Sequence, residues 1–351
     1  MSNLIYGQRY RRLLDKSRAE GYALPAVNVV NTNTVNAALE AAAKVGSDII
    51  IQVSSGGAQF FAGKGVADKF QAQVKGAVAF AKYTREIAAL YDVNVILHTD
   101  HANKKLLPWI DGLLTAGEEY YAQHGEPLFS SHMIDLSAEP LEENVATCKE
   151  FLVRIEKLEM SLEIELGVTG GEEDGVDNED VDNAKLYTQP EEVLYAYDEL
   201  KDTGHITVAA SFGNVHGVYK PGNVELRPII LHNSQERIQA DRGTEAKPLS
   251  FVFHGGSGSD RADIREAIGY GVFKMNIDTD TQFAFTKPVR DYCVDNEYRL
   301  ARQIGTPEDP DAPNKKVLDP RVWMRLAEEN FRDRLCLAFE DLLGMGKRVD
   351  A

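Results

Sequence analysis

Eight short apolar runs, rich in β-branched residues, recur along the 351-residue chain, and longer stretches with helical periodicity separate them. The runs occupy residues 23–30, 48–54, 93–99, 130–137, 161–167, 206–213, 249–255 and 272–278. Buried strands that alternate with helices predict a parallel sheet, and eight of them in a chain of this length predict a (β/α)₈ barrel, or TIM barrel, with additions. We expect residues 1–351 to form this single domain. A doubly wound open sheet is the alternative.

Polar residues gather at the carboxyl ends of the predicted strands. They are Asn28, Ser54, Asp100 with His101, Asp135, Glu165, His216, His254, and Asn276 with Asp278. In a barrel these ends meet at one mouth, where nearly all characterised members carry their active sites. The pattern therefore predicts that residues far apart in the sequence converge on one site.

Three of these residues are histidines that follow apolar runs, in ILHTDH, FGNVHG and FVFHGG. Each of them taken singly is better explained as a strand-end residue that is hydrogen-bonded to backbone. Three together favour a metal, because zinc binds neutral imidazole and a catalytic zinc site has three protein ligands and one open position. His101, His216 and His254 are therefore the candidate ligands.

Two motifs at the ends of the last two predicted strands favour a phosphate site. HGGSGS (residues 254–259) follows an apolar run and precedes a helical stretch, and NIDTDT (residues 276–281) has the same place after the eighth run. Glycine-rich turns are common, but backbone amides near a helix amino terminus bind phosphate, and barrels often build this site after strands seven and eight.

Two segments interrupt the alternation of strands and helices. Residues 170–188 form a long acidic stretch, which we interpret as a lid over the mouth, with a solvated loop as the alternative. Residues 302–316 contain TPEDPDAP and read as an irregular surface insertion. A final helix is expected from Pro320, with Asp319 as its cap and with Gly344 and Gly346 at its end.

The composition excludes several classes of protein. A formal charge of −17 argues against nucleic acid or an anionic membrane as a partner, although an acidic protein can still bind small phosphates. No run approaches the roughly 18 to 20 apolar residues of a membrane span, and the charged amino terminus does not resemble a signal peptide. We therefore expect a cytoplasmic protein. The three separated cysteines indicate neither disulfides nor a zinc finger.

Five stretches resemble one known family, the class II, metal-dependent fructose-1,6-bisphosphate aldolases, in their longer-chain subgroup. The stretches are NVILHTDHANKK, LEIELGVTGGEEDGVDN, ASFGNVHGVYKPGNV, FVFHGGSGS and KMNIDTDTQFAFT, and they follow the family order. The resemblance implies a homodimeric barrel lyase of glycolysis and gluconeogenesis. It would reversibly cleave fructose 1,6-bisphosphate, through a metal-stabilised enediolate, to dihydroxyacetone phosphate and glyceraldehyde 3-phosphate.

The same resemblance implies roles for individual residues. His101, His216 and His254 match zinc ligands, and Asp135 and Glu165 match carboxylates of an alternative or second divalent site. Asp100 matches the acid/base at the C4 oxygen, and Glu173 matches the base that deprotonates dihydroxyacetone phosphate. Substrate contacts are implied for Asn28, Ser54, Gly217, Gly255, Gly256, Ser257, Asn276, Ile277, Asp278, Thr279 and Arg321. Arg321 would reach a phosphate from the neighbouring subunit. A monovalent cation (Na⁺ or K⁺) is also implied.

The chemistry of aldol cleavage agrees with these residue types. A divalent metal spreads the negative charge that develops beside a carbonyl, and a carboxylate on a closing loop gains basicity as water is excluded. Asp100 and His101 are adjacent, so a turn at the strand end must bring both into the mouth.

Other functions remain open on the sequence alone. A tagatose-1,6-bisphosphate aldolase would use the same groups on an epimeric substrate. A zinc or cobalt epimerase of sugar phosphates on the same scaffold would release no triose. A metabolite-binding protein without activity is disfavoured, because Asp100, Glu173 and the histidines are all retained.

Overall fold

Eight parallel strands close into a barrel in the computed structural model, which describes residues 3–168, 170–173, 176–177, 186–216 and 225–350. Around the barrel the order is β1-β11-β10-β8-β5-β4-β3-β2. The strands are β1 (Leu24–Asn28), β2 (Ile49–Val53), β3 (Val95–Thr99), β4 (Ser131–Ile134), β5 (Ser161–Leu166), β8 (Ile206–Ala210), β10 (Phe251–Phe253) and β11 (Val272–Ile277). Each lies inside one of the eight predicted runs, so the predicted TIM barrel is confirmed and the open sheet is excluded.

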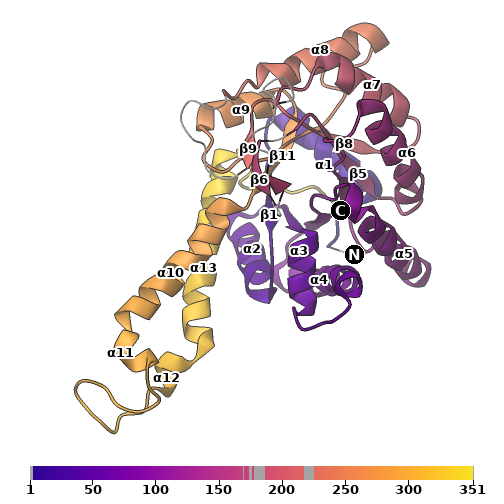
Figure 1. The fold of residues 1–351 in the computed structure, drawn as a ribbon. Coiled ribbons are helices and arrows are strands. Elements are labelled where there is room, and N and C mark those ends of the chain that lie inside the picture. Colours follow the sequence, from indigo (N-terminus) through magenta and orange to yellow (C-terminus); the bar gives the residue numbers. More distant parts are fainter. Residues whose placement is uncertain (1–2, 169, 174–175, 178–185, 217–224, 351) are drawn as a thin grey trace.

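Helices surround the barrel on its outer side (Figure 1). They are α2 (Thr32–Val45), α3 (Ser55–Ala62), α4 (Lys69–Tyr91), α5 (Leu107–His124) after the 3₁₀ turn η1 (Lys104–Leu106), α6 (Leu141–Lys157), α7 (Pro190–Leu200), α8 (Ile229–Arg242) and α9 (Arg261–Gly269). Most residues of the barrel strands are fully buried, because the helices cover one face of the sheet and the barrel interior the other. This double burial explains why the strands read as continuous apolar runs.

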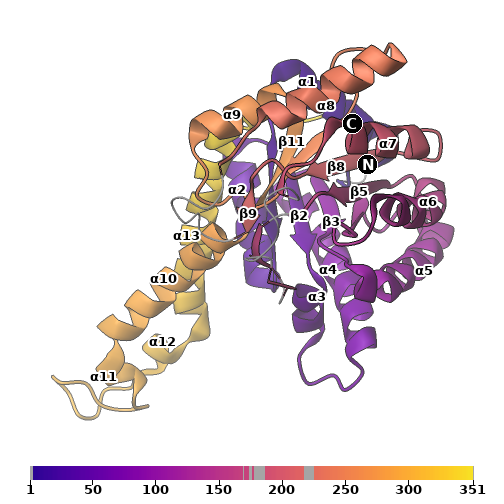
Figure 2. The same cartoon turned by 45° about the horizontal axis from the view of Figure 1, so that its top comes forward.

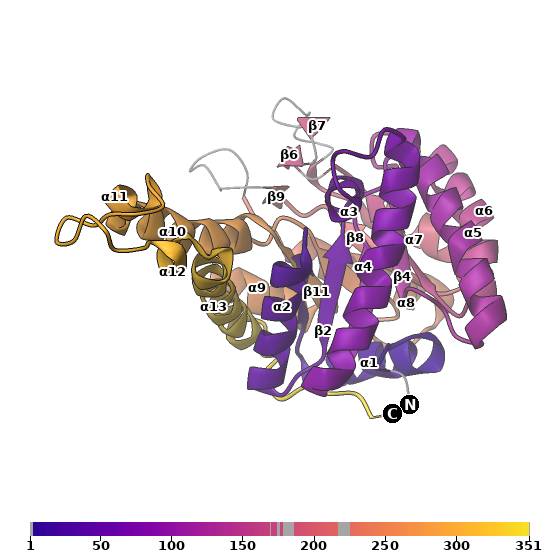
Figure 3. The ribbon, with the colours of Figure 1, turned by 90° about the horizontal axis from the view of Figure 1, so that it is seen from below.

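The two ends of the barrel differ, as Figure 3 shows. At one end, α1 (Gly7–Glu20) and both chain termini lie beside the amino ends of the strands, and the segment before α1 pairs with β3 through Leu4 and Val95. At the other end lie β6 (Gly170–Glu173), β7 (Val176–Asp177) and β9 (Val215–His216). The mouth predicted to hold the site is this second end.

The acidic stretch predicted as a lid contains two short strands in its described part. β6 pairs in antiparallel fashion with β7 and in parallel with β9, with Gly170 opposite Val215 and Gly171 opposite His216. The segments that follow β5 and β8 are thus joined above the mouth. Residues 174–175 and 178–185 of the expected lid lie outside the described residues.

A helical arm projects from the side of the barrel (Figures 1 and 2). It consists of α10 (Thr279–Asp295), α11 (Glu297–Leu300), α12 (Lys315–Leu318) and α13 (Pro320–Asp341). Residues 302–314 of the predicted insertion lie between α11 and α12 at the outer end of the arm, and its last two residues begin α12. The chain therefore leaves the barrel along α10 and returns along α13.

The start of α13 is as predicted and its end is not. The Asp319 carboxylate accepts a hydrogen bond from the backbone N–H of Arg321 at 3.0 Å and so caps the helix. α13 ends at Asp341, before the predicted glycines, and Leu343 takes the left-handed conformation (φ 57°) that glycine usually supplies at a helix end. Gly344 serves instead for close packing, because a Cβ there would lie 2.7 Å from the carbonyl oxygen of Ala23.

Candidate active site at the barrel mouth

The backbone just after β3 takes a left-handed conformation, and the two adjacent side chains there both point into the mouth. β3 ends at Thr99, and His101 has a φ of 33°, which non-glycine residues rarely adopt. In a regular strand, adjacent side chains point to opposite faces of the sheet. The positive φ of His101 changes the direction of the backbone, so that Asp100 and His101 both reach the same site. Such backbone strain is typical of functional sites, and no residue pattern around His101 indicated it.

The side chains of Asp100, His101 and His254 converge. One ligand atom from each lies within 4.8 Å of the others, and the rings of His101 and His254 are 4.6 Å apart between centroids. His101 follows β3 and His254 follows β10, so the cluster joins strands from opposite sides of the barrel. The sequence prediction that these strand ends meet is correct for this part of the site.

Two carboxylates extend the cluster. The Nδ1 atom of His101 lies 3.1 Å from Asp135 Oδ2 and 3.5 Å from Glu165 Oε2, and the Nδ1 atom of His254 lies 3.4 Å from the same Glu165 oxygen. His101, Asp135 and Glu165 form a second group whose ligand atoms lie within 4.8 Å of one another. Imidazole nitrogens and carboxylate oxygens are common zinc ligands, and here they lie close enough together to share one ion.

Two groups of the cluster, His254 and Asp135, have pKa values shifted from their usual ranges. Burial by itself would lower the pKa of His254, but the carboxylates of Glu165 and Glu163 outweigh it and raise the pKa to about 9. Burial would raise the pKa of Asp135, yet the hydrogen bonds from His101 and Ser137 lower it to about 2. The mouth therefore concentrates negative charge around two imidazoles, which is the electrostatic setting that a cation would stabilise.

Two carboxamides fix the carboxylate of Asp100, which is 1% exposed. The Nδ2 group of Asn28 donates to Asp100 Oδ2 at 2.9 Å, and that of Asn276 donates to Oδ1 at 3.2 Å. Asn28 is in turn held by Gln52, its neighbour in register on β2, whose Nε2 group donates to Asn28 Oδ1 at 2.6 Å. Two neutral amide donors thus fix the orientation of both Asp100 oxygens.

A buried ionic network lies in the barrel interior below the cluster. Lys274 donates to both oxygens of Glu163, at 2.9 and 2.7 Å, and His98 and His254 face the same carboxylate. These contacts hold the pKa of Glu163 well below its usual range, against the raising effect of burial. Sequence reasoning missed Glu163, Lys274, His98 and Gln52. The signal was present, since Glu163 and Lys274 interrupt apolar strands two residues before Glu165 and Asn276.

The predicted phosphate loops lie side by side, because β10 and β11 are paired. Gly255 has a φ of 64°, and a Cβ on Gly256 would lie 2.5 Å from Met275 Cγ, so only glycine permits this approach to β11. Ser257 is buried. Asp278 and Thr279 lie at the amino terminus of α10, where backbone N–H groups favour an anion. The side chain of Ile277 is buried in the apolar core, so only its backbone could contact a substrate.

Among the predicted residues whose side chains the structure describes, Ser54 and Arg321 lie outside the cluster. Ser54 caps α3, with its Oγ accepting from the N–H of Gly57 at 3.2 Å. Arg321 lies on the arm, 89% exposed, and pairs with Asp319. His216 and Glu173 are placed by their backbones in β9 and β6 above the mouth, and their side chains lie outside the described residues, as does the whole of Gly217.

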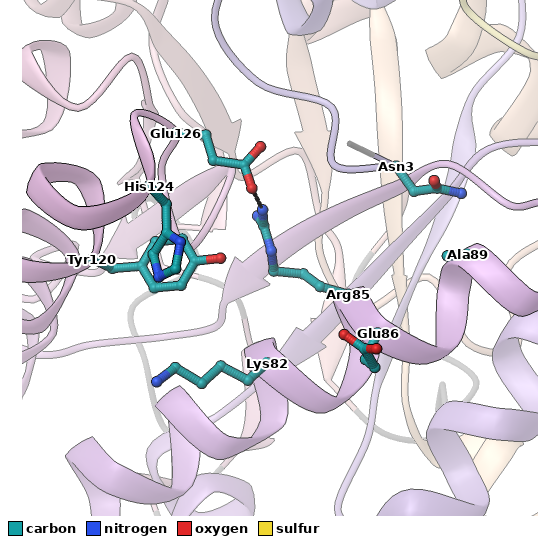
Figure 4. A pocket seen from close by; sticks show the side chains of 8 residues that line it. All are labelled: Asn3, Lys82, Arg85, Glu86, Ala89, Tyr120, His124 and Glu126. Carbon is teal, nitrogen blue, oxygen red and sulfur yellow. Dashed lines mark hydrogen bonds and ion pairs between the residues drawn. The ribbon is translucent and has the colours of Figure 1, made fainter. Parts of the chain in front are cut away.

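A cavity of about 480 Å³ lies elsewhere, between α4 and α5 (Figure 4). Asn3, which lines it, pairs with Val95 at the amino end of β3, so the cavity is remote from the mouth. Arg85, which lines the cavity, is paired with Glu126. The ring of Tyr120 packs against the ring of His124 and against the guanidinium group of Arg85. This cavity contributes nothing to the cluster.

Comparison with known proteins agrees with the geometry. Residues 8–347 match the model of the family described as "Fructose-bisphosphate aldolase class-II". The chain belongs to this family. It is 57% identical to a fructose-bisphosphate aldolase of Haemophilus influenzae over 97% of this chain and 95% of the relative. It is 53% identical to the class 2 fructose-bisphosphate aldolase of Escherichia coli, with the same coverage of both chains.

A solved structure of a fructose-bisphosphate aldolase from Campylobacter jejuni superposes with a TM-score of 0.90 at 53% identity, and covers 99% of this chain and 97% of that chain. The E. coli aldolase YdjI, at 20% identity and a TM-score of 0.65, shares the fold. The resemblance read from the five sequence stretches is therefore confirmed over nearly the full length.

Class II aldolases depend on a divalent metal, and the mouth of this member fits one. Two imidazoles and three carboxylates converge there, and all five residues are buried or half-buried. So many acidic groups around two imidazoles are costly to bury without a cation. In the described part of the chain, no helix is long and apolar enough to cross a membrane.

Proposed function

We propose that the protein catalyses the reversible aldol cleavage of fructose 1,6-bisphosphate to dihydroxyacetone phosphate and glyceraldehyde 3-phosphate, with zinc held by His101, His216 and His254. The observation that carries this proposal is the convergence of Asp100, His101 and His254 at the mouth of a class II aldolase barrel. His216 is included because its backbone lies in β9, which joins the loops above that mouth.

Asp100 is the proposed acid and base for the C4 oxygen. When bound, the metal supplies positive charge that stabilises the negative charge developing on the substrate's ketone and hydroxyl oxygens. Asp100 takes the C4 hydroxyl proton during cleavage and returns it during condensation. The carboxamides of Asn28 and Asn276 hold both of its oxygens in place, so that the proton moves along a fixed direction.

Glu173 is the proposed base for the C3 proton of dihydroxyacetone phosphate in the condensation direction. It ends β6, and β6 is paired with β9 above the mouth. A carboxylate carried by the segment above the mouth can approach bound substrate and exclude water from the carbon that loses its proton.

The ketose phosphate is proposed to bind where the backbone of residues 255–257 and 277–279 meets the hydroxyl groups of Ser257 and Thr279, with Asp278 as a further substrate contact beside it. Support comes from the paired strands β10 and β11 and from the glycine-only approach at Gly256. The second phosphate is proposed to contact Arg321 of a neighbouring subunit. Asn28, Ser54, Gly217 and Asn276 are proposed to contact the substrate between the phosphates.

Two further cations are proposed for the mouth. Asp135 and Glu165 share His101 as a neighbour, which supports a second or alternative divalent position beside the zinc. A monovalent cation, Na⁺ or K⁺, would bind backbone oxygens near the phosphate loops.

A homodimer formed through the helical arm is proposed as the assembly. Phe283 and Val294 on α10 are 67% and 69% exposed, and Ile304 beyond α11 is 61% exposed. Such apolar surface on a projecting element favours burial against a partner. Arg321 is the second residue of α13, which begins at the outer end of the arm, away from its own barrel. That place supports the proposal that Arg321 reaches the second phosphate in the partner's mouth.

The proposed activity is tested by following triose phosphate release from fructose 1,6-bisphosphate in a coupled assay. Activity should disappear with EDTA, return with added zinc or cobalt, and survive borohydride in the presence of substrate. The same assay with tagatose 1,6-bisphosphate decides between the epimers. Zinc-loaded protein that cleaves only the tagatose epimer, or releases no triose from either, would overturn the proposal.

A further inference from the structure

The interior ion pair of Glu163 and Lys274 lies directly beneath a candidate metal ligand. β5 and β11 are separated in the barrel by β8 and β10, so the contact between these two side chains crosses the barrel interior. Both side chains are 2% exposed, and Lys274 Nζ is 2.7 and 2.9 Å from the two oxygens of Glu163. Two charges buried this deeply are stable only while they neutralise each other.

Glu163 also contacts the imidazole of His254. Its Oε1 atom lies 2.9 Å from His254 Nε2. A carboxylate that accepts from the Lys274 ammonium through both oxygens has no proton to donate, so the hydrogen between Glu163 and His254 belongs to Nε2. A neutral His254 then has its lone pair on Nδ1, the nitrogen that lies 3.4 Å from Glu165. Nδ1 is thus the nitrogen on the side of the cluster.

The sequence positions of these residues form two layers in the barrel. Glu163 and Glu165 are two apart on β5, and Lys274 and Asn276 are two apart on β11, so each pair points to the same side of its strand. The upper members, Glu165 and Asn276, belong to the mouth. The lower members, Glu163 and Lys274, form a layer beneath the mouth, and Glu163 of this layer contacts His254.

We propose that Glu163 and Lys274 are positioning residues for the metal site, in which Glu163 fixes the tautomer and orientation of His254 and Lys274 supplies the charge that allows Glu163 to be buried. The inference rests on the proposed zinc site. Metal-binding histidines commonly donate their second N–H to a carboxylate, and loss of that partner typically weakens metal binding about 10- to 100-fold.

Two double variants separate orientation from charge. Glu163→Leu with Lys274→Met removes the ion pair and the acceptor for His254, whereas Glu163→Gln with Lys274→Met removes the same charges but keeps a carbonyl acceptor. Zinc affinity is measured by competition with a chromophoric chelator, and the folding of the metal-free proteins by thermal unfolding. Wild type is measured first, since its failure to bind zinc would refute the metal site itself.

The leucine variant should bind zinc about 10- to 100-fold more weakly than wild type, while the glutamine variant should stay within about threefold. Equal zinc affinity in wild type and both variants would overturn the proposal. If the leucine variant does not fold, ¹⁵N NMR of the histidine-labelled, zinc-loaded wild type decides the question. A hydrogen on Nε2 of His254 with the metal on Nδ1 is expected, and the reverse assignment would overturn the proposal.

Discussion

The mouth of the barrel and the helical arm use side chains in opposite ways. At the mouth, polar groups are buried: Asp100, His254, Glu165 and Asn276 are each less than 10% exposed and contact one another. On the arm, apolar side chains such as Phe283 and Ile304 are more than half exposed. Buried polar groups cost free energy that a bound substrate or metal offsets, and exposed apolar groups cost free energy that a partner surface offsets. Each region therefore implies a different kind of binding.

The largest effect is expected from removing a candidate ligand. His101→Ala should lose stoichiometric zinc and lower kcat/KM by about 10³-fold or more, because the metal supplies several kcal/mol of transition-state stabilisation. Bound zinc and cleavage rate are the measurements. His232→Ala, at a half-buried histidine of α8 that pairs with Glu236 and stacks on Tyr270, is the control and should bind zinc and cleave substrate as wild type does. Full zinc content in the His101 variant would show that the mouth is not the metal site.

A smaller loss is expected from Asp100→Asn, which retains the shape of the side chain but cannot carry the proton. We expect kcat to fall about 10²- to 10⁴-fold with zinc still bound. The variant also faces the donors of Asn28 and Asn276 with an amide, so its thermal stability should be measured alongside. If zinc is lost together with activity, Asp100 is a ligand rather than a proton carrier.

Substitutions of exposed apolar residues on the arm should change the assembly of the protein and hardly change the stability of its fold. Phe283→Glu with Val294→Glu should convert dimers to monomers in sedimentation velocity, while the free energy of unfolding of each subunit changes by about 0.5 kcal/mol or less per exposed site. Leu90→Glu is the matched control, because Leu90 is 81% exposed on α4 of the barrel. Dimers that persist in the arm variant would place the interface elsewhere.

The smallest effect is expected where α13 contacts the barrel. Arg325 and Arg332 pair with Glu40 of α2 at 2.7 and 2.6 Å and hold the pKa of Glu40 at about 2. Because the pKa is lowered on folding, the pair stabilises the protein above the unfolded pKa of about 4.3, and this contribution disappears as the pH falls towards 2. Solvent screening limits the effect to about 1 kcal/mol.

Glu40→Gln should therefore lower the free energy of unfolding by about 1 kcal/mol at pH 7 and by much less near pH 2. Denaturant unfolding at the two pH values measures the difference. An equal loss at both pH values would mean that packing, rather than charge, holds α13 against α2.

Periodicity predicted the barrel and the strand ends, since a strand buried on both faces must be apolar throughout and its polar end residue marks the mouth. Asp100, His101 and His254 were found in this way and do converge. Their geometry was not predictable, because nothing in LHTDHAN indicates that His101 takes a positive φ. Glycine or asparagine would have been the usual signal for that conformation.

Contacts across the barrel interior could not be predicted from the sequence either. The pairing of Glu163 with Lys274 depends on which strands face each other, and periodicity gives the face of a strand but not its place around the barrel. The short pairing of β6 with β9 was missed because glycine and acidic residues carry little β-propensity. The roles of all the predicted site residues, among them His216, Glu173 and Arg321, stay predictions.

The central claim is that the histidine cluster at the mouth binds a divalent metal, and anomalous X-ray scattering at the zinc edge tests it most directly. Crystals of zinc-loaded protein should give a peak coordinated by His101 and His254. A peak that lies away from both imidazoles, or protein that takes up no zinc while folded, would contradict the account.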